Sequence, residues 1–155
     1  MTYKRIRTSL LAGLAGSAVH FAFMGLKAWT GLLPSFRPYE DLQRALVELV
    51  GASVPAAVPW LISFANGTVV LGFLFARTYR LIPGRGGAAK GFVFGVLGWL
   101  LVGLVFLPLL GQGAFAVNVG LGPWPGILTL AMVLTYSIVL GIVDAALRPQ
   151  STTDS

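Results

Sequence analysis

The chain has 155 residues, of which 56% are hydrophobic and only 10% are charged, and its formal net charge is +6. Soluble domains carry about 25% charged residues, so this composition excludes a soluble globular protein, and its high hydrophobicity excludes a disordered chain. The sequence predicts an all-α, polytopic integral membrane protein that forms one domain over residues 1–155.

Four apolar segments are long enough to cross a bilayer, because one helical crossing takes about 20 apolar residues. The first runs from about residue 6 to 32. Its charge-free part, Thr8 to Leu26, is longer than the apolar region of a cleaved signal peptide, so we expect an uncleaved first span. The other spans cover about residues 57–81, 88–107 and 124–147, the last two being separated by a turn rich in glycine and proline.

Residues 38–50 predict a short amphipathic helix between the first two spans. The apolar positions 42, 45, 46 and 49 fall on one helix face. Glu40 and Arg44 lie on the other face with the spacing of an i,i+4 ion pair. We expect this helix to lie on the outer membrane surface, and the polar tail at residues 150–155 to fray.

The distribution of basic residues predicts the orientation of the spans. Eight of them lie near the N-terminus, in the turn after the second span, or after the fourth span. Only Lys27, Arg37 and Arg44 lie on the opposite side. Because positive charge marks the cytoplasmic side, we expect four crossings with both termini in the cytoplasm. The basic residues follow this topology, so nucleic acid is not an expected partner.

Small residues recur at intervals of four along every span. Such stripes let helix backbones approach each other in a bilayer, where no hydrophobic force acts between helices. The stripes predict either packing within one bundle or an interface with a second copy or another membrane subunit. The glycines that we expect at helix contacts are Gly16, Gly72, Gly87, Gly91, Gly95, Gly103 and Gly141.

Three polar residues fall at a similar depth on three different spans. A rise of 1.5 Å per residue places His20, Asn66 and Tyr136 at roughly 17 to 21 Å from the inner boundary. Polar groups at mid-membrane depth are costly unless they are paired. We therefore expect either a hydrogen-bonded layer that fixes helix register, or a ligand-binding site for a small molecule, a lipid or a proton.

Asp144 lies near the inner end of the fourth span, one helical turn before Arg148. Arg77 is expected at a similar height on the second span. A charge pair among these residues is the leading interpretation, and a carboxylate that carries a transported ion or a proton is the alternative.

The chain offers few groups for chemistry. It has one histidine, no cysteine and no paired carboxylates within a span. One histidine leaves most of a metal coordination sphere empty, and no nucleophile or phosphate-loop motif occurs. We expect a protein that is not an enzyme and holds no metal or cofactor.

The second half of the chain carries several motifs of glycine and aromatic residues. These are Asn66-Gly67, Gly91-x-x-x-Gly95-x-x-Gly98-Trp99, and Pro108-Leu109-Leu110-Gly111-Gln112-Gly113-Ala114-Phe115. Over about residues 60–147 the chain resembles uncharacterised small four-helix proteins of the bacterial inner membrane, loosely of the YagU kind. The resemblance implies a multi-pass protein of the bacterial cytoplasmic (inner) membrane and no established activity. Such proteins often carry histidines near the positions of Asn66 and in the last span, where this chain has Asn66 and Tyr136.

Two hypotheses for the function follow. The first is a non-enzymatic accessory or structural subunit that packs through its small-residue stripes, in a larger membrane complex or with itself. The alternative is a binder or transporter of a small molecule or lipid that uses the mid-membrane polar layer. The orientation of the three polar side chains distinguishes them, because a binder needs them to line a cavity.

Overall fold

The computed structural model describes residues 3–148, and this part of the chain is helical and has no strand. Four helices are long and apolar enough to cross a membrane: Lys4–Thr30, Ala57–Thr78, Gly86–Leu109 and Trp124–Ala146. The predictions of an all-α fold and of four apolar helices are confirmed. The prediction for the tail at residues 150–155 lies outside the described residues.

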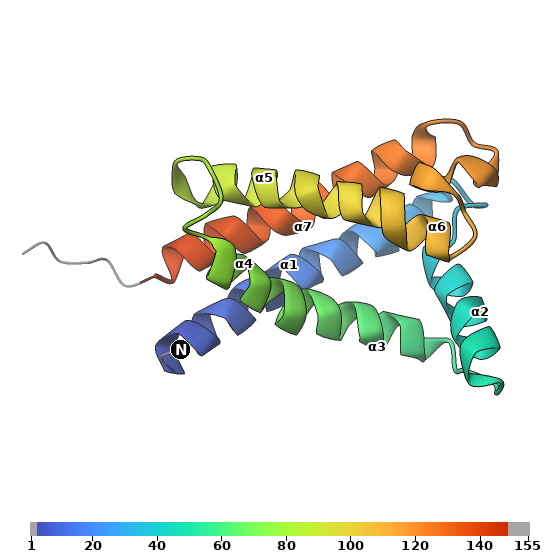
Figure 1. Cartoon of the computed structure of the whole chain (residues 1–155), viewed down its shortest axis with the longest axis horizontal. Coiled ribbons are helices and arrows are strands. Elements are labelled where there is room, and N and C mark those ends of the chain that lie inside the picture. Colours follow the sequence, from blue (N-terminus) through green and yellow to red (C-terminus); the bar gives the residue numbers. More distant parts are fainter. Residues whose placement is uncertain (1–2, 149–155) are drawn as a thin grey trace, which may run out of the picture.

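The four spans run back and forth along one long axis (Figure 1). Helix α1 (Tyr3–Thr30) begins at the end of the bundle where α7 (Trp124–Ala146) stops, and the turn at residues 79–85 lies at that same end. We call this end the basic end, because eight of the eleven basic residues lie at or near it. The opposite end carries α2 (Pro38–Val50), and we call it the α2 end.

Helix α2 has the bounds that its sequence pattern predicts. Pro38 occupies the first turn, where a missing backbone N–H costs nothing, and Glu40 and Asp41 lie near the positive end of the helix dipole. Gly51 ends the helix with a φ of 69°, and its N–H bonds to the carbonyl of Val47. Glycine adopts this left-handed conformation without a steric penalty.

Two of the spans are interrupted by π-helical turns. The second span consists of α3 (Ala57–Ala65), the π stretch η1 (Asn66–Leu71) and α4 (Gly72–Thr78). The third consists of α5 (Gly86–Leu101), the π stretch η2 (Val102–Phe106) and α6 (Leu107–Leu109). A π turn holds more residues than an α turn, so it changes which side chains face a neighbouring helix.

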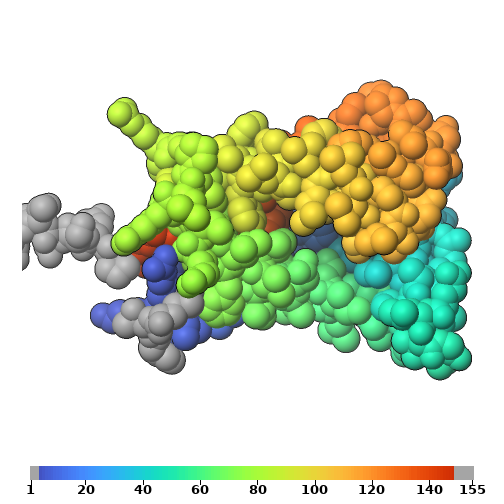
Figure 2. Space-filling view, in the orientation of Figure 1, coloured from blue at the N-terminus to red at the C-terminus, as the bar shows by residue number. Residues whose placement is uncertain are grey.

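The most extensive contact between spans joins α5 to α7, and α1 contacts α7 as extensively as it contacts the second span. Helix α1 lies against η1 and α4 of the second span, whereas α5 lies against α7, and α1 crosses α7. The second and third spans diverge toward the α2 end (Figure 1). The space-filling view shows a hollow between them, with α1 and α7 visible behind it (Figure 2).

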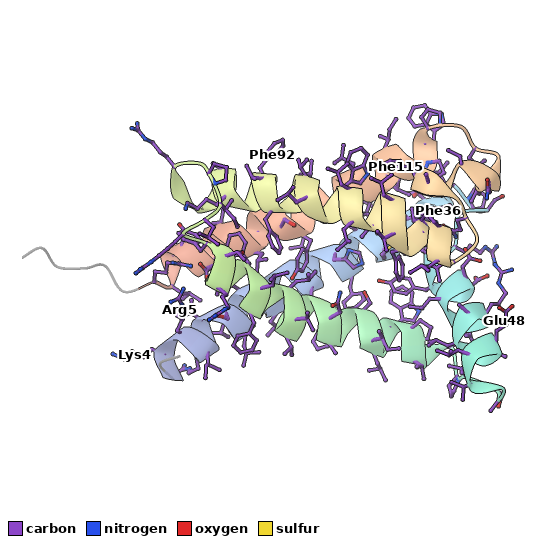
Figure 3. All side chains as sticks on the ribbon, viewed as in Figure 1. Lys4, Arg5, Phe36, Glu48, Phe92 and Phe115 are labelled. Carbon is purple, nitrogen blue, oxygen red and sulfur yellow. The ribbon has the colours of Figure 1, made fainter. Side chains whose placement is uncertain are left out.

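The connector between the third and fourth spans folds back on the α2 end. It contains the 3-10 stretch η3 (Ala114–Val119), in which Phe115 and Ala116 have positive φ angles of 51° and 62°. Ala116 is fully buried, and the ring of Phe115 lies 4.6 Å from that of Trp99. Phe115 points into the bundle, whereas Phe92 points away from it (Figure 3).

Candidate functional site

Tyr136 lies at a junction of three spans. Its hydroxyl donates a 2.5 Å hydrogen bond to the carbonyl oxygen of Gly67, in η1. A Cβ on Gly16 of α1 would come 2.7 Å from the Tyr136 ring, so the ring fills the space that this glycine leaves. Tyr136 is buried, and its polar atom is used inside the fold.

His20 belongs to a second hydrogen-bonded group, toward the α2 end. Its Nε2 lies 2.9 Å from the hydroxyl of Tyr39, and that hydroxyl lies 3.0 Å from the Oγ of Ser63. The Tyr39 ring also stacks on Trp60, with centroids 4.0 Å apart. The group fastens α2 to α1 and α3. Burial raises the pKa of Tyr39, and its hydrogen bond with Ser63 partly opposes that rise.

Asn66 does not join His20 and Tyr136. Its side chain is exposed, and it has no hydrogen-bond partner among the residues that the structure describes. The α1-facing positions of this segment are Gly67, Thr68 and Gly72. The π stretch begins at Asn66, so the spacing of an α-helix does not give the direction of its side chain. The structure therefore does not assemble the three-residue polar layer, and its ligand-binding role stays a prediction.

Asp144 lies at the basic end and is only 2% exposed. Arg148 donates to its Oδ2 from Nη2 at 2.6 Å and from Nε at 2.7 Å. The guanidinium of Arg148 also lies 3.4 Å from the ring centroid of Tyr79, and Lys90 donates to the Tyr79 carbonyl at 2.6 Å. Arg77 is exposed and makes no ion pair with Asp144 in residues 3–148, so the charge pair is formed by Asp144 and Arg148.

The seven glycines that the stripes single out all lie against another segment of this chain. Gly87 and Gly91 of α5 face the backbone of Gly141 and Ser137 of α7, where an added Cβ would come under 3.0 Å from a carbonyl oxygen. The remaining contacts are with residues of α1, α7 and the connector. They join Gly95 to Ser137, Gly72 to Ser9, Gly16 to Tyr136, and Gly103 to Phe115.

A buried polar contact ties α2 to the connector between the third and fourth spans. The Gln112 amide donates to the Asp41 carboxylate, which also pairs with Arg44. Asp41 is 8% exposed and Gln112 is 6% exposed. The Oε1 of Gln112 is buried without a hydrogen-bond partner in the described residues.

A model of one protein family matches residues 3–155. The chain belongs to the family of unknown function DUF6789. No curated protein and no solved structure matches it. The family description names no activity. It does not bear on the resemblance to YagU-like proteins, which stays a prediction.

Most of the interior polar groups of this DUF6789 chain bond to one another or to backbone. In residues 3–148 no group of three or more histidine and acidic side chains could hold a metal ion. Tyr39, Ser63, Tyr79 and Gln112 are the polar residues that the sequence analysis missed as members of these groups. The signal for Gln112 was present, because it is one of two polar side chains in an otherwise apolar connector.

Proposed function

We propose that this chain is a non-enzymatic, multi-pass protein of the bacterial inner membrane that serves as an accessory or structural subunit of a larger membrane complex. The observation that carries the proposal is the exposed side chain of Asn66 on the second span. Its amide is a strong donor and acceptor that the described part of the chain leaves unpaired.

The depth of Asn66 makes its exposure costly. It lies nine residues from the start of the second span, at Ala57, and twelve from its end, at Thr78, which is roughly 14 and 18 Å at 1.5 Å per residue. In the proposed orientation the amide thus faces hydrocarbon near the middle of the bilayer, where no water can satisfy it. A hydrogen bond between spans contributes about 0.6 to 1.7 kcal/mol there.

The surroundings of Asn66 suit a helix partner. Ala65 beside it is small and exposed, and Ile62, Val69 and Val70 are exposed aliphatic residues. This face fits a transmembrane helix that presents a hydrogen-bonding side chain at the same depth. The glycine stripes contribute to this role indirectly. They hold the chain's own helices together, and the Asn66 face is left to contact a partner helix.

The binder or transporter hypothesis has less support. Tyr136 bonds to a backbone carbonyl in a close-packed junction, and His20 bonds to Tyr39. Neither side chain lines a described pocket. For the orientation we retain the charge argument, which places the basic end and both termini in the cytoplasm.

Gentle extraction of the tagged protein at native abundance, followed by mass spectrometry of the co-purifying proteins, tests the proposal. We expect a stoichiometric set of membrane subunits, which is lost in Asn66→Leu and kept in part in Asn66→Gln. Thr135→Leu is the matched control, because the Thr135 hydroxyl bonds to its own helix, at the Ala131 carbonyl. A chain that purifies alone would contradict the proposal.

A further inference from the structure

A pocket of about 430 Å³ lies at the α2 end, between the last turns of α1, the first turns of α2 and the start of α3. This volume is in the range of sites for small ligands. The pocket is lined by apolar side chains, among them Met24, Leu32, Phe36 and Trp60, and by a few charged ones. It is separate from the Asn66 face and is not used by the proposed function.

The charge of the pocket centres on Lys27. Its Nζ donates to the carbonyl oxygens of Phe36 at 2.9 Å and Leu33 at 3.3 Å, which hold the ammonium in place and leave one of its three protons free. The other basic residue of the lining, Arg37, donates from Nη1 to both carboxylate oxygens of Glu40, at 3.0 and 3.2 Å. The lining thus has two positive charges and one negative charge, and the Lys27 charge is the one without an acidic partner in residues 3–148.

The pocket lies at the level of a membrane interface. Trp29, Trp60 and Trp124 are all exposed and lie at or near span ends on the α2 side of the bundle. Tryptophan is enriched where the hydrocarbon meets the headgroups. Lys27 lies in the last turn of α1, at this same level, so its ammonium is within reach of lipid headgroups.

We propose that this pocket binds one anionic phospholipid. The phosphate diester pairs with the Lys27 ammonium, through its free N–H, and the first methylenes of an acyl chain lie along Met24, Leu32 and Trp60. The net positive charge of the lining favours a headgroup of net negative charge over a zwitterionic one, and the apolar wall contributes dispersion contacts with the acyl chain. The hydrogen bonds of Tyr39 to His20 and Ser63 hold the α2 side of the pocket in place.

The test is a titration of the delipidated full chain in detergent, followed by native mass spectrometry. The probes are phosphatidylglycerol, phosphatidylcholine and inorganic phosphate. We expect one tightly bound phosphatidylglycerol, at least tenfold weaker binding of phosphatidylcholine, and no competition from millimolar inorganic phosphate. Equal binding of the two lipids, or full competition by phosphate, would overturn the proposal.

Three variants locate the site. Lys27→Met removes the charge and should weaken phosphatidylglycerol binding at least tenfold. Lys90→Met is the matched control, since Lys90 also donates to a carbonyl but lies at the basic end, and it should bind as the parent does. Ala28→Phe keeps the charge and fills the pocket, so it tests the site even where Lys27→Met fails to fold. Parent-like binding by Ala28→Phe, or an equal loss in Lys90→Met, would refute this location.

Discussion

Replacing Gly91 by alanine should separate α5 from α7. An added Cβ would come under 3.0 Å from the Ser137 carbonyl oxygen, which is backbone and cannot rotate away. The helices would have to move apart by up to about 1 Å, and such a gap loses a quarter to a half of the dispersion energy at each contact. Overpacking costs about 1 to 3 kcal/mol, and we expect the upper value here. Helix propensity returns about 1 kcal/mol, which leaves a net loss of about 2 kcal/mol in the free energy of unfolding.

Gly98→Ala is the matched control, because it makes the same change on the same helix. There the added Cβ would meet only Val133 Cγ1, at 3.5 Å, which is an ordinary contact. Gly98→Ala should therefore keep the propensity gain, and the two variants should differ by about 3 kcal/mol. The assay is reversible unfolding in mixed micelles of rising dodecyl sulfate content, followed by tryptophan fluorescence. Equal shifts of the unfolding midpoint in the two variants would refute the packing argument.

Three further predictions concern the polar contacts. Tyr136→Phe removes the hydrogen bond to Gly67 and should cost about 1 kcal/mol in the same unfolding assay; a loss above 3 kcal/mol would show that the hydroxyl does more than bond to backbone. Arg148→Ala leaves the Asp144 carboxylate, which is only 2% exposed, without its partner, and should destabilise the chain more than Asp144→Ala, which leaves a partly exposed guanidinium stacked on Tyr79; the same titration measures both, and the reverse order would contradict this reasoning. Burial raises the pKa of Tyr39, so the folded chain keeps this proton to higher pH than the unfolded chain. The contribution of Tyr39 to the free energy of unfolding is full below the unfolded pKa of about 10. It is lost as the pH rises from there through the higher pKa of the folded chain. Tyr39→Phe should reduce this fall in unfolding measurements from pH 8 to 11, and an unchanged pH dependence would count against it.

The sequence predicts the helices well because two strong signals set their limits. The bilayer thickness sets the length of a span, and charged residues and prolines mark its ends. Each observed span therefore begins and ends within three residues of its predicted bounds. The amphipathic segment has the bounds 38–50 in both cases. Glycine spacing also indicated close helix approach, and the structure places those glycines at internal contacts.

The direction of single polar side chains could not be predicted in the same way. The depth estimate for Asn66 assumes an unbroken α-helix. The residue types at positions 66–71 do not indicate the π turn, which changes the residues that face α1. The partners of His20 and Asp41 were missed for a different reason. A helix expected on the membrane surface was assigned no contacts with the bundle, whereas Tyr39 and Asp41 bond to residues 19 and 71 positions away.

The contact between Asp41 and Gln112 has a consequence for the order of events during synthesis. Two of the contacts between spans join helices that follow one another, the first with the second and the third with the fourth. Each pair can form as soon as its later member has left the ribosome. Helix α2 emerges early, yet its buried carboxylate meets an amide 71 residues downstream. The hydrogen bond between Gln112 and Asp41 therefore forms only after the third span has been synthesised, and a nascent chain halted before Gln112 carries the Asp41 carboxylate without this bond.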